Sequence, residues 1–241
     1  MSFSPALSKM IKENIVEIHR RISLICSGAG RDPGSVAIVA VSKGRDISSI
    51  EEALRSGITH IGENKVQEAL SKYKILSTID YRPSTLMWHM IGHLQTNKVK
   101  DAVSIFDLIE SVDSLHLAQE IDRQAARIHK IQDILVEVNI SGDRSKFGIK
   151  PQEAGALIKE ILSFGSIRVK GLMTIAPIVD AQEKARPYFS QLRTLLNEIN
   201  ETNAPHRLTI LSMGMSADFE PAIQEGATQV RIGRALFDTI S

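Results

Sequence analysis

Lys43 places a positive charge at the end of an apolar run, residues 36–42, that has the composition of a buried strand. An ammonium group at such a place must be solvated, paired or used in chemistry, because burying it without a partner is costly or forces it to become neutral. A neutral lysine amine is a nucleophile toward aldehydes. Lys43 is therefore our candidate for a residue that attaches a carbonyl compound.

Arg231 is the second candidate, and it lies in another apolar run, residues 228–232. Strand alternation points both side chains into the mouth of a closed barrel, in which the first and last strands are neighbours. Each cation would make the charge of the other more costly, which favours the free amine of Lys43. The alternative is that both are solvated rim residues or bind a carboxylate such as Glu137.

Two small-residue turns point to an anion site. The first, residues 212–216, follows an expected strand and leads into a helix that we expect to begin at Ser216. Free amides at a helix N-terminus bind anions, and a glycine lets the backbone approach closely. The second turn is Gly233, which is followed by a short terminal helix, residues 235–240. Barrels commonly form a phosphate site from the loops after strands seven and eight, so this pair of turns predicts one.

The alternative for Ser216 is a helix N-cap without a ligand. Asp218, in the first turn of the same helix, favours that alternative because its charge would repel a phosphate. If the phosphate site is present, an amine, an arginine and an anion cradle surround one mouth. That combination predicts a phosphorylated aldehyde as the ligand, and pyridoxal 5′-phosphate (PLP) is the obvious candidate.

Eight short runs rich in β-branched residues alternate with amphipathic segments along the chain. The expected strands span residues 36–42, 58–62, 86–91, 106–112, 134–140, 169–173, 208–212 and 228–232. The expected helices between them span residues 47–55, 65–76, 115–129, 151–162, 182–199 and 220–225. The period of the apolar residues and the capping residues support these assignments.

Eight such units predict an α/β protein with a (β/α)8 TIM-type barrel, formed as one domain over residues 1–241. We expect residues 5–27 to form an extra N-terminal helix that covers the bottom or side of the barrel. The rival is an open doubly wound sheet, which would carry a Gly-x-Gly-x-x-Gly turn after its first strand, where this chain has Ser-Lys-Gly-Arg. In a barrel the functional face lies at the C-terminal ends of the strands. The polar or glycine positions there are Lys43, Glu63, Asn64, His93, Asp113, residues 139–141, Thr174, residues 212–216, Gly233 and Arg234.

The composition excludes several classes of partner. A net charge of +1 over 241 residues gives no electrostatic reason to expect nucleic acid or an anionic membrane. No apolar stretch approaches the ~18 residues of a membrane span, and the N-terminus lacks a secretory signal, so we expect a cytoplasmic protein. The single cysteine, Cys26, excludes an internal disulfide and is interpreted as a helix-packing residue. We expect a monomer, because the charge is balanced and no apolar surface stripe is evident.

Other polar residues have simpler interpretations. His89 alternates with apolar neighbours and is interpreted as a hydrogen-bonded residue of the barrel interior. His93, Asp113 and His116 lack the spacing of a metal site, and we predict no metal. Lys72 is interpreted as part of a solvated helix face.

Short motifs along the chain form a specific set. They are Ala40-Val-Ser-Lys43, Gly62-Glu-Asn64, Trp88-His-Met-Ile-Gly92, Leu94-Gln-Thr-Asn-Lys98, Val138-Asn-Ile140, Ser145-Lys-Phe-Gly148, Lys170-Gly-Leu-Met173, Ser212-Met-Gly-Met-Ser216-Ala-Asp218 and Val230-Arg-Ile-Gly233. With these motifs the chain closely resembles the pyridoxal phosphate homeostasis protein family, the small relatives of the alanine racemase barrel. The resemblance extends over nearly the whole chain.

The resemblance implies that Lys43 forms an aldimine with the cofactor PLP and that Arg231 faces its pyridine nitrogen. It places Asn64 near the oxygen substituents of the cofactor. The residues implied around the phosphate are Ser212, Gly214, Ser216 and Gly233. Arg234 departs from the family pattern, because relatives often have a hydroxyl residue there, and it would offer a backbone amide and a guanidinium to the phosphate.

The resemblance also bears on catalysis. An arginine beside the pyridine nitrogen leaves it unprotonated and weakens the cofactor as an electron sink. The racemases use a tyrosine from a second domain, and this chain ends eight residues after Gly233, so we expect that domain to be absent. The tyrosines of this chain, Tyr73, Tyr81 and Tyr188, are expected in or beside the outer helices. We therefore expect a carrier for intracellular PLP homeostasis, which buffers the cofactor or delivers it by transient contact with PLP-dependent apoenzymes, with little or no turnover.

Two other functions stay open. The first is a PLP-dependent amino-acid racemase of low activity, with solvent or a strand-end residue such as His89 as the base. The second is a cofactor-free lyase in which Lys43 attacks a sugar phosphate directly and forms a Schiff base.

Overall fold

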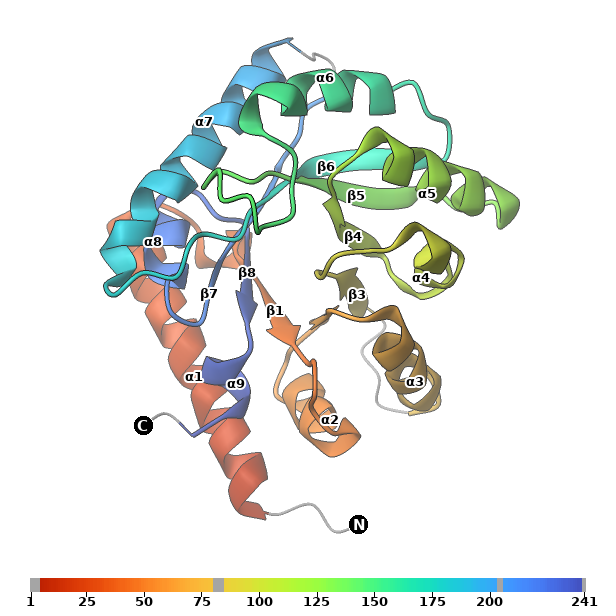
Figure 1. Cartoon of the computed structure of the whole chain (residues 1–241). Helices are drawn as coiled ribbons and strands as arrows, with labels where there is room; N and C mark the ends of the chain where they lie inside the picture. The colour runs from red at the N-terminus through yellow and green to blue at the C-terminus, as the bar shows by residue number, and fades with distance from the viewer. Residues whose placement is uncertain (1–4, 80–84, 203–205, 240–241) are drawn as a thin grey trace.

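Eight parallel strands close into a barrel in chain order, from β1 through β8 and back to β1 (Figure 1). The computed structural model describes residues 5–79, 85–202 and 206–239. The strands are β1 (Ala37–Val41), β2 (His60–Glu63), β3 (Met87–Met90), β4 (Leu108–Val112), β5 (Gln132–Glu137), β6 (Ile167–Met173), β7 (Ile210–Met215) and β8 (Gln229–Ile232). β8 pairs with β1, with Arg231 opposite Val39. The predicted (β/α)8 barrel is confirmed, and the open doubly wound sheet is wrong.

Helices surround the barrel on its outside (Figure 1). They are α1 (Pro5–Gly28), α2 (Ile47–Arg55), α3 (Val66–Leu76), α4 (Val99–Ile105), α5 (Leu115–Arg127), α6 (Pro151–Ile161), α7 (Arg186–Thr202), α8 (Phe219–Gln224) and α9 (Arg234–Phe237). The described residues also form three short 3₁₀ helices: η1 (Pro33–Ser35), η2 (Thr96–Lys98) and η3 (Gln182–Ala185). Within the described ranges, no helix combines the length and the apolar character needed to cross a membrane.

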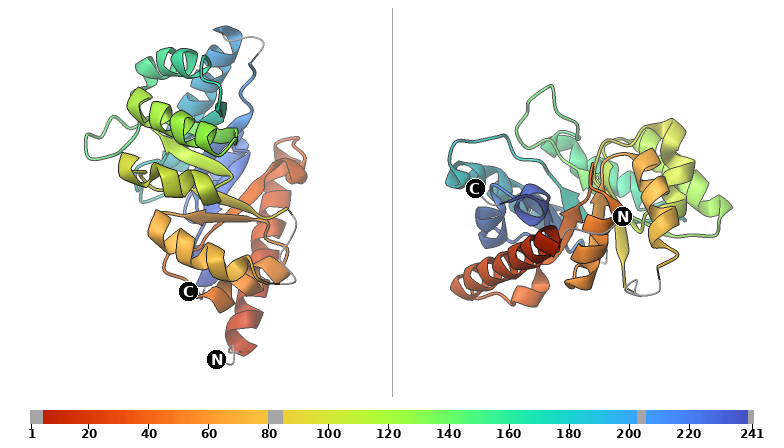
Figure 2. Two further views of the ribbon diagram at one scale, coloured as in Figure 1. Left: turned by 90° about the vertical axis from the view of Figure 1, so that its right-hand side faces the viewer. Right: turned by 90° about the horizontal axis from the view of Figure 1, so that it is seen from below.

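The extra N-terminal helix, α1, lies along the side of the barrel, where it packs against α2, α8 and α9 (Figure 2). Its buried apolar residues recur every three or four positions, which is the spacing of one helix face. They are Ile11, Ile15, Ile18, Ile22 and Cys26. Asn14 on the same face donates its side-chain amide to the carbonyl oxygen of Leu236 at 3.1 Å. This contact ties α1 to α9, and the packing role predicted for Cys26 is confirmed.

Two strands end three residues away from the predicted position, and the C-terminal ends of the other strands agree to within one residue. β5 ends at Glu137 rather than at residue 140, because the amide of Asn139 bonds to the carbonyl of Ile149 in the following loop. β7 continues past Ser212 through an irregularity at Gly214, whose φ of +92° is easy only for glycine. A glycine within an apolar run predicts a turn, and here it bends a strand that continues.

The last two helices also differ from the prediction. α8 begins at Phe219 rather than at Ser216, because the Asp218 side chain accepts a hydrogen bond from the backbone of the preceding turn. α9 ends at Phe237, so the two described residues that follow it lie outside the helix. Ile240, the predicted end of this helix, lies outside the described residues.

Two outer helices show where helix propensity fails as a guide. α4 was not predicted, because its seven residues include two valines and an isoleucine, which favour strands over helices. α7 begins at Arg186, four residues later than predicted, and the chain before it forms η3. Neither difference affects the barrel mouth.

The barrel interior has an apolar part and a polar part. Leu108, Leu135 and Met173 form a small apolar cluster that is separate from the layer between strands and helices. The next inward positions along β4 and β8 are Glu110 and Arg231, both buried. Charged groups therefore fill the half of the interior that lies closer to the C-terminal ends of the strands.

Candidate functional site

A cavity of about 280 Å³ opens at the C-terminal ends of β1, β7 and β8. The candidates from the sequence that line it are Lys43, Ser216, Arg231, Gly233 and Arg234. The order of the strands predicted that these residues lie at the same end of the barrel, and in the structure they line the same cavity. The candidates that do not line it are Asn64, Ser212 and Gly214.

Lys43 lies in the turn after β1, with an exposed side chain and a restrained backbone. The ammonium group of Lys72 donates to the carbonyl oxygen of Ser42 at 2.6 Å. The amide of Gly44 donates to a carboxylate oxygen of Glu68 at 2.6 Å. Both chain neighbours of Lys43 are thus tied to α3, while the Lys43 side chain extends to the cavity.

Lys72, Glu63 and Glu68 form an ionic cluster on the outer side of the barrel wall, which we call the wall cluster. Lys72 is 7% exposed, and its Nζ lies 2.7 Å from an oxygen of each carboxylate. Burial raises the pKa of Glu63, and the hydrogen bonds from Lys72 and Ser42 oppose that shift. The predicted solvated position of Lys72 is wrong, because α3 turns this residue toward β2 instead of toward water.

Arg231 lies inside the barrel, and its guanidinium is held at two points. One terminal nitrogen donates to the Ser212 hydroxyl at 2.6 Å, and the other donates to the carbonyl oxygen of Thr174 at 2.7 Å. Burial lowers the pKa of Arg231, and the charges of Glu110 and Glu137 oppose that shift. The two hydrogen-bond acceptors and the nearby carboxylates favour the cationic form of the side chain.

Ser212 connects Arg231 to a row of buried or half-buried polar groups, which we call the interior cluster: His60, His89, Glu110, Ser212 and Arg231. The Ser212 hydroxyl donates to Glu110 Oε2 at 2.5 Å, and Glu110 Oε1 lies 2.7 Å from His89 Nδ1. His89 Nε2 in turn lies 2.9 Å from His60 Nδ1. The interior, hydrogen-bonded position predicted for His89 is confirmed.

Glu110 and His60, two members of the interior cluster, differ in charge. Burial raises the pKa of Glu110, but the hydrogen bond from His89 and the charges of His89 and Arg231 outweigh it, so the pKa lies below its ordinary value. Burial and the charge of His89 lower the pKa of His60 to about 4. Glu110 is therefore ionised and His60 neutral near pH 7.

Ser216 makes different contacts from those expected of a helix start. Its hydroxyl accepts hydrogen bonds from the amides of Gly233 and Ala235, at 3.3 and 3.2 Å. It therefore caps the beginning of α9 rather than that of α8. Asp218 is buried beside it, and burial raises the pKa of its carboxyl group.

Gly214 and Gly233 are needed for different reasons. A Cβ at Gly214 would lie 2.6 Å from the Cβ of Ala222 and 3.0 Å from the Cα of Phe219, so a side chain would push α8 away from β7. A Cβ at Gly233 would lie 3.4 Å from the Cβ of Val41, which is a tight but tolerable contact. Gly214 thus has a packing role, whereas Gly233 keeps the cavity wall bare.

Asn64 and Glu137 lie at the ends of β2 and β5. Asn64 Oδ1 is buried and has no hydrogen-bond partner among the described residues, which is rare for a buried acceptor. Burial and the charge of Asp113 raise the pKa of Glu137 to about 7. Over the described ranges Glu137 forms no ion pair with Lys43 or Arg231, so it does not serve as the carboxylate partner considered from the sequence.

His89 is poorly placed to act as a base toward a ligand in the cavity. It is fully buried, and both ring nitrogens are in hydrogen bonds with other side chains. Tyr73 and Tyr188 lie in α3 and α7, as expected, and Tyr81 lies outside the described residues. The racemase alternative therefore loses the base that the sequence offered for it.

One wall of the cavity was missed by the sequence analysis. It comes from the loop after β6, where Pro177, Ile178 and Val179 line the cavity. Ile178 is fully exposed, which is unusual for so large an apolar side chain. The loop has no periodic pattern, and its proline was the only local signal.

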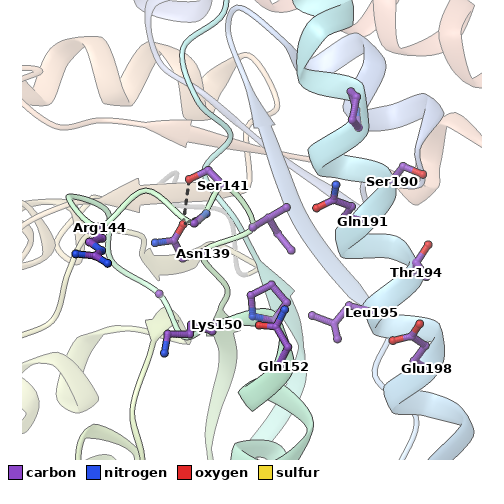
Figure 3. Close-up of a pocket in the computed structure, with 15 residues that line it drawn as sticks. Asn139, Ser141, Arg144, Lys150, Gln152, Ser190, Gln191, Thr194, Leu195 and Glu198 are labelled. Carbon is purple, nitrogen blue, oxygen red and sulfur yellow. Dashed lines mark hydrogen bonds between the residues drawn. The ribbon is translucent and has the colours of Figure 1, made fainter.

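A second cavity, of about 960 Å³, lies between the β5–α6 loop and α7 (Figure 3). Residues 139–141, which the sequence placed at the functional face, line this cavity instead of the one at Lys43. Asn139 Oδ1 accepts from the Ser141 hydroxyl and from the Gly142 amide, both at 3.0 Å, so its oxygen is used within the loop. Some of the predicted strand-end positions thus lie at the cavity of Lys43, and others lie at this second cavity.

The fold and the site define a (β/α)8 barrel protein with a cationic cavity at its C-terminal face. The family model described as "Alanine racemase, N-terminal domain" matches residues 15–239. The pyridoxal phosphate homeostasis protein of Aquifex aeolicus is 42% identical over 228 residues, which cover 93% of this chain and 96% of the relative. Its counterpart in Pseudomonas aeruginosa is 38% identical over 227 residues, with 94% of each chain covered.

A solved relative adds a structural comparison. PipY of Synechococcus elongatus PCC7942, in a structure with PLP bound, is 35% identical and superposes with a TM-score of 0.82. The match covers 94% of this chain and 99% of that chain. The chain belongs to the pyridoxal phosphate homeostasis protein family, as the sequence motifs predicted.

Proposed function

We propose that this protein binds PLP and holds it on Lys43, as a carrier that buffers or delivers the cofactor inside the cell with little or no turnover. The observation that carries the proposal is the single cavity that contains Lys43, Arg231 and the turn at Ser216 and Gly233. The PLP in the structure of PipY, a relative that is matched over 99% of its own chain, supports the choice of ligand.

The residues at the cavity match the polar groups of PLP one by one. The Lys43 amine matches the aldehyde, and the Arg231 guanidinium matches the pyridine nitrogen, which accepts a hydrogen bond. The Arg234 guanidinium and the backbone at Gly233 match the phosphate. Asn64 does not line the cavity, but it has a buried oxygen that lacks a partner in the described part of the chain, and we assign it to the ring hydroxyl.

Lys43 would attach the cofactor by attack of its amine on the aldehyde carbon with loss of water, which leaves an imine bond. PLP supplies an electron sink when bound, and an arginine at the pyridine nitrogen makes that sink weak. Arg231 therefore favours storage of the cofactor over carbanion chemistry. Delivery requires transient contact of the monomer with PLP-dependent apoenzymes.

Absorbance of the purified protein with added PLP tests the attachment. Wild type should show the absorbance of a lysine-bound cofactor, Lys43→Ala should lose it, and Lys100→Ala, an exposed lysine of α4, should retain it. Borohydride reduction and mass measurement of the Lys43 peptide should give a PLP adduct. An unchanged spectrum in Lys43→Ala would contradict the proposal, and a sugar-phosphate adduct would favour the lyase.

Exchange of α-protons tests the carrier role separately. The PLP-loaded protein is incubated with single enantiomers of several amino acids in deuterated water. We expect no exchange above the level of free PLP. Exchange that depends on Lys43 would favour the racemase.

A further inference from the structure

The interior cluster contains a buried carboxylate that the proposed function does not require. Glu110 is fully buried on β4, on the opposite side of the barrel from Ser212 on β7 and Arg231 on β8. A buried ionised carboxylate is costly unless donors satisfy it. One donor, His89, lies on the neighbouring strand β3, but the other, Ser212, crosses the barrel interior, so its bond joins strands that are not neighbours in the sheet.

Ser212 separates the two charges of this cluster. The Arg231 nitrogen lies 3.9 Å from Glu110 Oε2, while the Ser212 hydroxyl lies within hydrogen-bond distance of both, at 2.6 and 2.5 Å. A direct, two-pronged pair would use two guanidinium donors at once. With the hydroxyl between them, the carboxylate balances the arginine charge and takes none of its donors.

The position of the Arg231 guanidinium is fixed at both terminal nitrogens. Ser212 holds one and the carbonyl of Thr174 holds the other, so the plane of the group is set before any ligand arrives. Arginine has five N–H donors, and these two bonds leave others for the cavity that Arg231 lines. An arginine prepared in this way loses less conformational entropy when it binds.

We propose that Glu110 is a positioning residue that acts through Ser212 to hold Arg231 in the orientation in which it donates to the pyridine nitrogen of PLP. The proposal rests on the proposed function, since it needs the cofactor in this cavity. It also gives Ser212 a role in supporting the arginine instead of the phosphate contact implied by the family resemblance.

The interior offers a matched comparison. Glu137 is also a buried carboxylate whose charge acts on Arg231, but in the described part of the chain no hydrogen bond links the two. If only the sum of negative charge mattered, Glu110→Gln and Glu137→Gln would have similar effects. If the bonded path matters, only Glu110→Gln and Ser212→Ala disturb the arginine.

The test uses the full chain, titrated with PLP at fixed pH for affinity and then titrated with pH to follow the absorbance of the bound cofactor. Glu110→Gln should weaken PLP binding about tenfold, and Ser212→Ala should weaken it several-fold. Both should move the protonation of the pyridine nitrogen toward higher pH by about one unit, because a loosened arginine no longer blocks it. Glu137→Gln should stay within about twofold of wild type.

The possible results distinguish a failure of the proposed function from a failure of the positioning role of Glu110. A wild type without PLP binding would overturn both. Wild-type affinity and wild-type pH titration in Glu110→Gln and Ser212→Ala would overturn this inference alone. If Glu110→Gln fails to fold, Ser212→Ala decides, because it removes one hydroxyl and leaves the bond between Glu110 and His89 in place. Equal losses in Glu110→Gln and Glu137→Gln would also overturn it.

Discussion

Two clusters of charged side chains lie on opposite sides of the barrel wall, and each supports one of the cations that face the cavity. The wall cluster, outside β1 and β2, holds the backbone on both sides of Lys43. The interior cluster holds the side chain of Arg231 itself, at both ends of its guanidinium. The first restrains the chain next to an exposed amine, whereas the second immobilises a buried guanidinium.

This difference corresponds to what each cation would do in the proposed function. A lysine that forms and breaks a bond to a ligand needs a free side chain, so only its backbone can be restrained. An arginine that donates to one ring atom gains from being fixed in advance. The two clusters also use ionic groups differently, since the wall cluster pairs its charges directly and the interior cluster separates them with a hydroxyl.

Removal of the cation from the wall cluster should have the largest effect on stability. Lys72→Met leaves Glu63 buried without its charged partner, which should lower the free energy of unfolding by about 3–5 kcal/mol. Urea denaturation of Lys72→Met and of Lys74→Met, an exposed lysine on the same helix, measures the difference. Similar stability of the two variants would mean that the cluster contributes little.

Glu137 provides the next test, because it is an interior carboxylate outside the interior cluster. Its pKa of about 7 lies above the ordinary value of 4.5, so the folded protein keeps a proton that the unfolded chain loses. The free energy of unfolding should therefore fall as pH rises from about 4.5 to 7, by roughly 3 kcal/mol at most.

Denaturation of wild type and Glu137→Gln at pH 5 and pH 8 tests this dependence. The variant cannot ionise at this position, so its stability should fall less over that range. An equal fall in both proteins would show that another group is responsible. Glu110, whose pKa is lowered by its donors, should add no such loss in this range.

The barrel and the gathering of Lys43, Ser216, Arg231, Gly233 and Arg234 in one cavity could be predicted from the sequence. Both follow from strand alternation and from the rule that the last strand of a barrel lies next to the first. No residue contact had to be known. The family motifs then indicated which ligand to consider.

The two clusters could not be predicted, because they depend on contacts between distant residues. Lys72 has the spacing of the buried residues of α3, but its charge favoured a solvated position, and its ion pair with Glu63 on the facing strand explains its burial. Ser212 and Glu110 are 102 positions apart, and no local pattern pairs them. The bend at Gly214 similarly depends on how closely α8 packs against β7.

A substitution of Glu68 should have the smallest effect on stability, and it tests whether the wall cluster restrains the backbone at Lys43. Glu68→Ala frees the amide of Gly44 but leaves the bond from Lys72 to Glu63, so the free energy of unfolding should fall by only about 1 kcal/mol. The turn that carries Lys43 would then move more easily, and bound PLP should dissociate several-fold faster. Stopped-flow transfer of PLP to an excess of a competing amine measures that rate, with Gln67→Ala, an exposed neighbour on α3, as the control.

A faster release with nearly normal stability would separate the restraint of Lys43 from the stability of the wall cluster. Unchanged release in Glu68→Ala would mean that the backbone restraint has no part in holding the cofactor.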